Sequence, residues 1–311
     1  MSIWKGKDIL HGNQFTKKDI EAILKVAGYF EKELKKKGSF NLLKGKILAT
    51  LFYEPSTRTR MSFEAAMQRL GGGVISMGSV ESSSVAKGET LADTVRTVSQ
   101  YADVIVLRHP RTGSAKEAAD ATPVPVINAG DGTGQHPTQA LLDIYTIHKE
   151  LGSLKGLKVS MVGDLKNGRT VHALVELLAL FGSALTFVSP EVLRMPEEII
   201  SRLKEKGIEV VETTDMKEAA RATDLIYMTR IQKERFGNLA EYEKVKGSYV
   251  IDENFLKDLQ KEITIMHPLP RVDEISSGVD TYAGAAYFRQ MRNGIYTRMA
   301  LLTMIMGKAV Q

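Results

Sequence analysis

The stretch from Glu54 to Arg60, with the sequence EPSTRTR, has the residue types of an anion-binding site. It follows an apolar run, 47–52, that is typical of a buried strand, and it opens an amphipathic segment that is typical of a helix. At such a junction, free backbone amides and the positive end of the helix dipole favour a negatively charged ligand. Three hydroxyl groups and two arginines in the same turn add donors and positive charge. The stretch therefore predicts a phosphate-binding site.

A simpler interpretation is that Ser56 or Thr57 only caps the helix, while Arg58 and Arg60 are solvated surface residues. The first turn of a helix normally favours acidic residues, because they complement the dipole. Two arginines in that turn oppose the dipole unless an anion offsets them. The charges therefore favour the phosphate site over the cap alone.

Length and composition predict a soluble protein of two domains. The chain has 311 residues, of which 43% are hydrophobic and 25% charged, values ordinary for a globular protein. It has no cysteine, which excludes disulfides and thiol chemistry and favours a reducing compartment. The polar segment 1–10 lacks the apolar core of a signal peptide, and no apolar stretch is long enough to span a membrane. We expect a cytoplasmic protein with no membrane partner.

The net charge of +5 would suit a nucleic-acid-binding protein, but the sequence has no basic stripe with interleaved aromatic residues. The only dense basic run, Lys35 to Lys37, lies at the end of a predicted helix, where cations complement the dipole. Six histidines are scattered without metal-ligand spacing. We therefore expect neither a nucleic-acid partner nor a bound metal.

Predicted strands and helices alternate along the chain. The expected strands cover 47–52, 74–77, 104–107 and 124–127 in the first half, and 158–162, 185–188, 208–211, 225–228 and 263–266 in the second. The expected helices cover 16–37, 58–70, 90–101, 136–150, 171–181, 197–206 and 289–308. This alternation predicts an α/β fold of two domains, each a mostly parallel sheet flanked by helices.

Polar side chains follow the predicted strands of the first half. Arg108 comes directly after 104–107, and His136 and Gln139 come after 124–127 and a glycine-rich turn. Open α/β sheets bind ligands at the carboxyl ends of their strands. A single histidine is more often structural than catalytic, but three such positions beside the EPSTRTR stretch favour a binding site.

The second half places arginines in the same way. Residues 162–170 follow a strand and open a helix, yet the G-x-G-x-x-G spacing of a dinucleotide site is missing, so we expect no nicotinamide cofactor. Arg230 and Arg271 also follow predicted strands. Guanidinium groups match carboxylates with two hydrogen bonds, so this cluster suits a substrate with several carboxylates.

Taken together, the motifs resemble those of the catalytic subunits of aspartate transcarbamoylases, across nearly the whole chain. They are STRTR at 56–60, KGET at 87–90, RHP at 108–110, HPTQ at 136–139, GDL at 163–165, GRT at 168–170, TRIQKER at 229–235 and HPLPR at 267–271. STRTR and HPTQ are shared with ornithine transcarbamoylases, so they indicate carbamoyl phosphate more firmly than the acceptor. Ornithine enzymes typically have a cysteine where this chain has Pro268. The arginines of the second half suit a dicarboxylate instead.

The resemblance implies an enzyme that needs no cofactor and transfers a carbamoyl group from carbamoyl phosphate to the α-amine of L-aspartate, early in pyrimidine biosynthesis. It implies a carbamoyl-phosphate-binding domain of 1–150 with 289–311, and an aspartate-binding domain of 151–288, linked by two interdomain helices. It also implies a homotrimer with active sites at the subunit interfaces, and leaves open whether a regulatory chain and allosteric control are present.

The resemblance also assigns site residues. Carbamoyl phosphate would be bound by Ser56, Thr57, Arg58, Thr59, Arg108, His136, Gln139, Pro268 and Leu269, and by Ser83 and Lys87 of a neighbouring subunit. Aspartate would be bound by Lys87, Arg169, Arg230 and Gln232. Catalysis would rest on Arg58, Thr59, Lys87, Arg108 and His136. Two other functions stay open: a dehydrogenase-like nucleotide-binding module, and a phosphate-sensing or scaffold protein that kept the fold without turnover.

Overall fold

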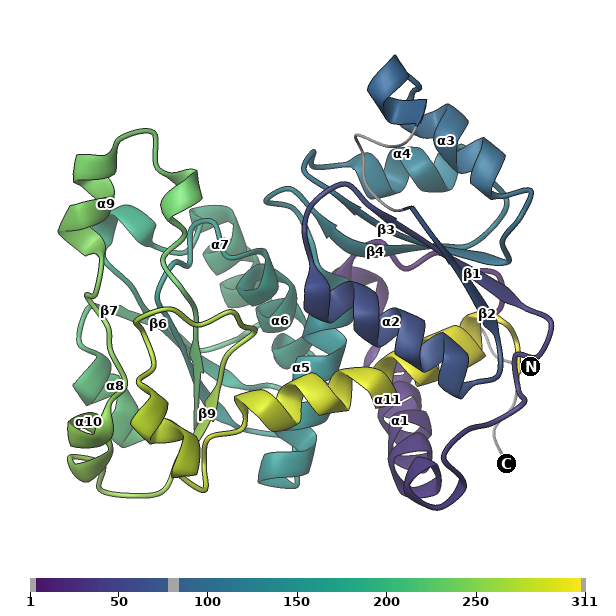
Figure 1. The fold of residues 1–311 in the computed structure, drawn as a ribbon. Helices are drawn as coiled ribbons and strands as arrows, with labels where there is room; N and C mark the ends of the chain where they lie inside the picture. The colour runs from purple at the N-terminus through teal and green to yellow at the C-terminus, as the bar shows by residue number, and fades with distance from the viewer. Residues whose placement is uncertain (1–3, 78–83, 309–311) are drawn as a thin grey trace. The chain divides into compact units, whose positions relative to one another are not determined.

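The structure is a computed structural model that describes residues 4–77 and 84–308 (Figure 1). The chain forms two compact units, which we call unit 1, residues 1–145 with 292–311, and unit 2, residues 146–291. The domains predicted from the sequence, 1–150 with 289–311 and 151–288, have boundaries a few residues away. The ligands assigned to those domains remain predictions.

Unit 1 contains a parallel sheet with the strand order β2-β1-β3-β4. Its strands are β1 (Ile47–Phe52), β2 (Gly73–Ser76), β3 (Val104–His109) and β4 (Val126–Asp131). The apolar residues of β1 and β3 are buried, as expected where helices cover both faces of a parallel sheet. In Figure 1, α3 (Leu91–Val98) and α4 (Ser114–Asp120) lie on one side of this sheet, and α2 (Thr57–Arg69) lies on the other.

The remaining helices of unit 1 include α1 (Lys17–Lys37), which begins and ends as its sequence predicts. The Thr16 side chain accepts from the N–H of Asp19, and the Asp19 carboxylate accepts from the N–H of Thr16 in return. Gly38, with φ of 71°, ends the helix. Two short turns, η1 (Gly12–Gln14) and η2 (Ser84–Lys87), complete the unit.

Unit 2 contains a second parallel sheet, with the order β7-β6-β5-β8-β9. The strands are β5 (Lys158–Val162), β6 (Ala184–Val188), β7 (Val210–Thr213), β8 (Leu225–Met228) and β9 (Thr264–Met266). The helices are α6 (Arg169–Ala179), α7 (Glu197–Glu205), α8 (Met216–Ala222), α9 (Leu239–Val245) and α10 (Glu253–Lys257), with turns η3 (Glu191–Leu193), η4 (Lys233–Arg235) and η5 (Ser277–Thr281). Helices α5 (Pro137–Leu151) and α11 (Tyr287–Ile305) contain residues of both units, as predicted for linking helices.

The two parallel sheets and their flanking helices confirm the predicted α/β class, with some errors in detail. The sequence analysis missed α4, α8, α9 and α10, which are short. It also began β4 too early, because Pro123 and Pro125 have no N–H to donate to a neighbouring strand. Within the described ranges, no helix is long and apolar enough to cross a bilayer.

Candidate active site

Both sheets reverse their strand order at a point where site motifs emerge. In unit 1 the chain order reverses between β1 and β3, which pair through Phe52 and Arg108 at their carboxyl ends. In unit 2 it reverses between β5 and β8, which pair through Val162 and Met228. Such reversals are where open α/β sheets bind ligands, because the flanking loops diverge there. The structure therefore brings each unit's predicted motifs to one sheet edge.

In unit 1, the start of α2 has the features of an anion site. Ser56 occupies the position before the helix, but its side chain makes no capping hydrogen bond, and the first turn contains no acidic residue. No group in the described ranges accepts a hydrogen bond from the N–H of Thr57, Arg58 or Thr59. Thr59 is buried, while Thr57 and Arg58 are exposed. The donors of this turn are thus available to a ligand.

The two arginines of this turn differ in their partners. Arg60 Nε lies 3.5 Å from Glu64 Oε1, one helical turn away. Arg58 has no ion pair within the described residues, and partial desolvation by its surroundings lowers the pKa of its guanidinium. A cation without a counter-ion at a helix start favours an anionic ligand, and Arg58 is the stronger candidate of the two.

Arg108, at the end of β3, is held close to this turn. Its Nε lies 3.3 Å from Glu54 Oε2, and its Nη1 donates to the Ala129 carbonyl oxygen at 3.4 Å. The backbone carbonyl of Arg108 accepts from the N–H of Tyr53 at 2.8 Å. Glu54, which follows β1, and Ala129, in β4, thus hold the guanidinium between neighbouring strand ends.

His136 and Gln139 lie at the start of α5 and are both buried. The carbonyl of His136 accepts from the N–H of Gln139 at 3.0 Å. The helix begins at Pro137, so His136 directly precedes it and Gln139 lies in its first turn. His136 Nδ1 lies 3.4 Å from the Thr138 hydroxyl. Gln139 Nε2 donates to Asp143 Oδ1 at 2.9 Å.

Lys87 ends the turn η2 and is exposed. It makes no ion pair or hydrogen bond within the described ranges. Ser83, which the resemblance assigns to the same site, lies outside the described residues. Within the described ranges, Lys87 therefore has no hydrogen bond or ion pair to the STRTR turn of its own chain.

In unit 2, Asn167 and Gln232 are organised around one buried carboxylate. Asp164, directly after β5 and fully buried, accepts from the backbone N–H of Asn167 at 3.0 Å and of Gln232 at 3.4 Å. Gln232 Nε2 donates to the carbonyl of Asn167 at 3.2 Å, and Arg169 opens α6 two residues later. Burial raises the pKa of Asp164 despite these hydrogen bonds. The loops after β5 and β8 are thereby tied together.

Arg230 already holds a carboxylate. Its two terminal nitrogens donate to the two oxygens of Glu234 at 3.0 and 2.6 Å. These hydrogen bonds raise the pKa of Arg230, and the same contact lowers the pKa of Glu234. Because Glu234 is exposed, a substrate carboxylate can replace it without leaving a buried charge.

Pro268 and Leu269 follow β9 in a loop fixed by a buried histidine. His267 Nδ1 accepts from the N–H of Leu269 at 2.8 Å, so Nε2 carries the proton and donates to Glu274 Oε1 at 2.7 Å. Burial alone would raise the pKa of Glu274, but the hydrogen bond from His267 lowers it. Leu269 has φ of 55°, a conformation that the loop must hold in place. The backbone carbonyls of Pro268 and Leu269, which are the predicted acceptors of this loop, are thus held in a fixed conformation.

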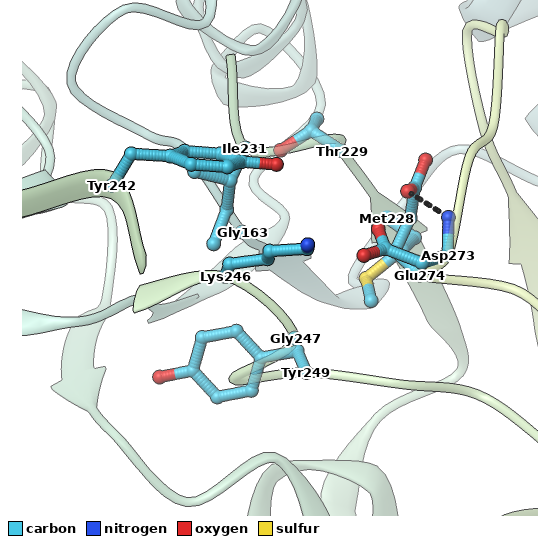
Figure 2. Close-up of a pocket in the computed structure, with 10 residues that line it drawn as sticks. All are labelled: Gly163, Met228, Thr229, Ile231, Tyr242, Lys246, Gly247, Tyr249, Asp273 and Glu274. Atoms are coloured by element: carbon cyan, nitrogen blue, oxygen red, sulfur yellow. Dashed lines mark hydrogen bonds between the residues drawn. The ribbon is translucent and has the colours of Figure 1, made fainter. Parts of the chain in front are cut away.

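A small pocket in unit 2 borders the same loops, and it adds Lys246, Asp273 and Glu274 to the residues of the quoted motifs (Figure 2). It is lined by Thr229 and Ile231 beside Arg230, and by Lys246. In the view of Figure 2, Lys246 lies between the rings of Tyr242 and Tyr249, with its amine on the side of Asp273 and Glu274. The pocket thus places Lys246, Asp273 and Glu274 at the edge of the unit 2 sheet where Arg230 follows β8.

Gly163 allows the loops after β5 and β8 to lie in close contact. It has φ of 115°, and a Cβ on it would lie 2.2 Å from the Thr229 carbonyl oxygen, while Thr229 is held by two hydrogen bonds to Val162. We expect Gly163→Ala to lower the free energy of unfolding by roughly 3 kcal/mol, through backbone strain and overlap. Gly182→Ala, with φ of 70° and open space around the site, is the matched control and should cost only about 1 kcal/mol. Denaturant unfolding measures both, and equal losses would contradict the role of the close contact.

Two family models match the chain. The carbamoyl-P binding domain of aspartate/ornithine carbamoyltransferases matches residues 7–149, and the Asp/Orn binding domain matches residues 155–305. The chain belongs to the aspartate/ornithine carbamoyltransferase family. The identification made from the motifs is thereby confirmed, and so is the two-domain fold.

Individual carbamoyltransferases are similar over their whole length. The aspartate carbamoyltransferase catalytic subunit of Thermococcus kodakarensis is 55% identical over 304 residues, which cover 98% of each chain. A Trypanosoma cruzi aspartate transcarbamoylase, solved in complex with carbamoyl phosphate and aspartate, has a TM-score of 0.94 and 43% identity, with 98% of each chain covered. The catalytic subunit of M. jannaschii aspartate transcarbamoylase has a TM-score of 0.90 and 52% identity, with 97% of this chain and 98% of that chain covered.

The sequence analysis missed the acids that position this carbamoyltransferase's basic and polar side chains. Glu54 contacts Arg108, Asp143 accepts from Gln139, Glu234 pairs with Arg230, and Glu274 accepts from His267. One of these pairs, Gln139 and Asp143, has i,i+4 spacing on a helix, α5, a signal that helical periodicity could have supplied. Within the described ranges, no group of three or more histidine or acidic side chains could hold a metal ion.

Proposed function

We propose that this protein transfers the carbamoyl group of carbamoyl phosphate to the α-amine of L-aspartate, giving N-carbamoyl-L-aspartate and phosphate. The observation that carries the choice of acceptor is Arg230, which holds a carboxylate through two hydrogen bonds. A second half-buried arginine of the same unit, Arg169, opens α6. The names of the similar carbamoyltransferases support the same choice. The reaction is an early step of pyrimidine biosynthesis.

Carbamoyl phosphate binds at the carboxyl edge of the unit 1 sheet. Ser56, Thr57, Arg58 and Thr59 hold the phosphate, supported by the unoccupied N–H groups at the start of α2. Arg108, His136 and Thr59 donate to the carbonyl oxygen. Gln139 and the backbone carbonyls of Pro268 and Leu269 accept from the carbamoyl NH2 group. Donors and acceptors thus match the two ends of the ligand.

The reaction proceeds by charge stabilisation alone. The uncharged amine of aspartate attacks the carbonyl carbon, and negative charge collects on the carbonyl oxygen. The bond between that carbon and the phosphate oxygen then breaks, and the nitrogen gives up one proton to the departing phosphate. Preorganised cationic donors at both places lower the barrier, and such donors are typically worth about 10²–10³ each in rate. No covalent enzyme intermediate, cofactor or metal ion is required.

Aspartate binds through Arg169, Arg230 and Gln232 of unit 2. One substrate carboxylate replaces Glu234 on Arg230, keeping the geometry of two parallel hydrogen bonds. Ornithine would instead bring an ammonium group toward these arginines, which is unfavourable. The arginines therefore select a dicarboxylate.

The active form is a homotrimer in which Ser83 and Lys87 reach the site of a neighbouring subunit. The exposed Lys87, without an ion-pair partner in the described part of its own chain, supports this assignment. A regulatory chain is a further candidate partner. A cytoplasmic location suits both substrates.

The function is tested by measuring phosphate release from carbamoyl phosphate. We expect turnover with L-aspartate and none above background with L-ornithine, with the product identified by mass as N-carbamoylaspartate. Comparable turnover with ornithine would reject the acceptor. Tight binding of carbamoyl phosphate without turnover would instead favour the phosphate-sensing function.

A further inference from the structure

Gln139 has an amide that can present either a donor or an acceptor to a ligand. Its Nε2 donates to Asp143 Oδ1 at 2.9 Å, one turn along α5. An ionised carboxylate can only accept, so it fixes which end of the amide faces it. No hydrogen bond to Gln139 Oε1 occurs within the described ranges. The carbonyl end of the amide is therefore left open to a donor.

Asp143 is fully buried, and the charge it interacts with is equally buried. Arg298, on α11, is 3% exposed and lies with its guanidinium 4.9 Å above the ring centroid of Phe63. Burial lowers the pKa of Arg298 to about 10, and the negative charge of Asp143 opposes that shift, so the arginine stays protonated at neutral pH. Arg298 Nε has no hydrogen-bond partner in the described part of the chain.

Burying the charges of Asp143 and Arg298 contributes little net stability to the fold, because both must be removed from water. Two desolvated charges in a core usually contribute no more than apolar residues of the same size. Arg298 is not even fully hydrogen-bonded, although Gln139 and Asp143 are well aligned on one helix face. The arrangement is better explained by the property that it gives Gln139, a single amide orientation.

We propose that Asp143 and Arg298 are positioning residues that hold the Gln139 carbonyl oxygen toward the NH2 group of carbamoyl phosphate. Arg298 keeps Asp143 ionised, Asp143 therefore accepts from Gln139 Nε2, and Gln139 Oε1 accepts from the ligand. The proposal rests on the proposed function. Through Gln139, the pair would let the protein distinguish a carbamoyl group from an acyl group of the same shape. The acyl group has no N–H to donate to Gln139 Oε1.

The matched ligand for the test is acetyl phosphate, in which a methyl group replaces the NH2. We expect the wild-type protein to bind carbamoyl phosphate about tenfold or more tightly than acetyl phosphate, because the methyl group leaves Gln139 Oε1 unpaired. Asp143→Asn can pair with either end of the Gln139 amide and should lose most of this preference. The affinity for inorganic phosphate should stay unchanged in both proteins.

Three further variants separate positioning from folding. Gln139→Leu should lower the preference at least as far as Asp143→Asn does, because it removes the side-chain acceptor and leaves only the backbone carbonyls of Pro268 and Leu269. Asp19→Asn changes another buried acid of unit 1, which accepts from Trp4 Nε1 at 2.8 Å, and should lower stability while keeping the preference. The double variant Asp143→Asn, Arg298→Met removes both buried charges. It should recover melting temperature relative to Asp143→Asn without recovering the preference.

Each outcome has a distinct meaning. A preference kept in Asp143→Asn but lost in Gln139→Leu would overturn the positioning role, and so would a double variant that recovers preference together with stability. A preference kept in Gln139→Leu would overturn it as well, since Gln139 would not contact the amide. If the wild-type protein binds neither acyl phosphate, the proposed function itself fails.

Discussion

Replacing Arg58 with alanine is expected to lower turnover by about two orders of magnitude or more. Arg58 carries a positive charge beside three unoccupied N–H groups, where the phosphate develops charge as it leaves. The melting temperature should change little, because the side chain has no ion pair in the described part of the chain and opposes the helix dipole. Steady-state rates and thermal unfolding of the purified protein measure both effects.

The same helix supplies the control. Arg69→Ala removes an arginine from the last turn of α2, where its guanidinium donates to the Gly38 carbonyl. It should lower stability slightly and leave turnover intact. Arg60, already paired with Glu64, should show an effect between the two. Unchanged turnover in Arg58→Ala would place the phosphate site elsewhere.

The sequence predicts features that depend on local chemistry. The pattern of strand 47–52 is apolar on both faces and fixes β1, and the Thr16 to Asp19 capping pair and Gly38 fix α1. The short helices α8 and α10 were missed because each has about two turns or fewer, too few for periodicity to be visible. Local capping residues, Asp215 and Asp252, were the only signal for them.

The sequence predicts the basic residues of the candidate site but assigns no role to its acidic residues. A resemblance assigns residues that touch ligands, whereas Glu54 and Glu274 contact other groups of the protein, among them Arg108 and His267. Their partners are apparent only once β1 lies beside β3 and the loop after β9 folds back. Asp143 and Arg298 are separated by about half of the chain, so no pattern in the sequence indicates that they interact.

These acids also prepare the site to bind anions, because they hold arginine side chains in position. Arg108 and Arg230 each carry an acid that holds the guanidinium in place before a ligand arrives. A substrate anion can replace such an acid at low cost, because the geometry is already set. Arg58 and Lys87 are different, since neither has an ion pair within the described ranges. We expect a ligand or a group of another subunit to supply the negative charge that interacts with each of them.

Arg58 and Lys87 can be tested together for a role in one shared site. If the active site is shared between subunits of a trimer, Arg58→Ala and Lys87→Ala proteins should each be nearly inactive when pure. Dissociating and reassembling the two together should restore activity, because some sites then combine an unmutated Arg58 from one subunit with an unmutated Lys87 from the next. With equal random mixing, about three quarters of the trimers contain both proteins.

In a cyclic head-to-tail trimer, every mixed assembly contains one intact site of the three, whichever variant is in excess. Recovery should therefore approach roughly a quarter of wild-type activity. Reassembling Arg58→Ala protein with itself gives the background, and native mass measurement establishes that mixed trimers formed. Mixed trimers without recovered activity would reject the shared site and return Lys87 to its own chain's pocket or to the solvated surface. Recovery near a quarter would assign Arg58 and Lys87 to one site across the subunit interface.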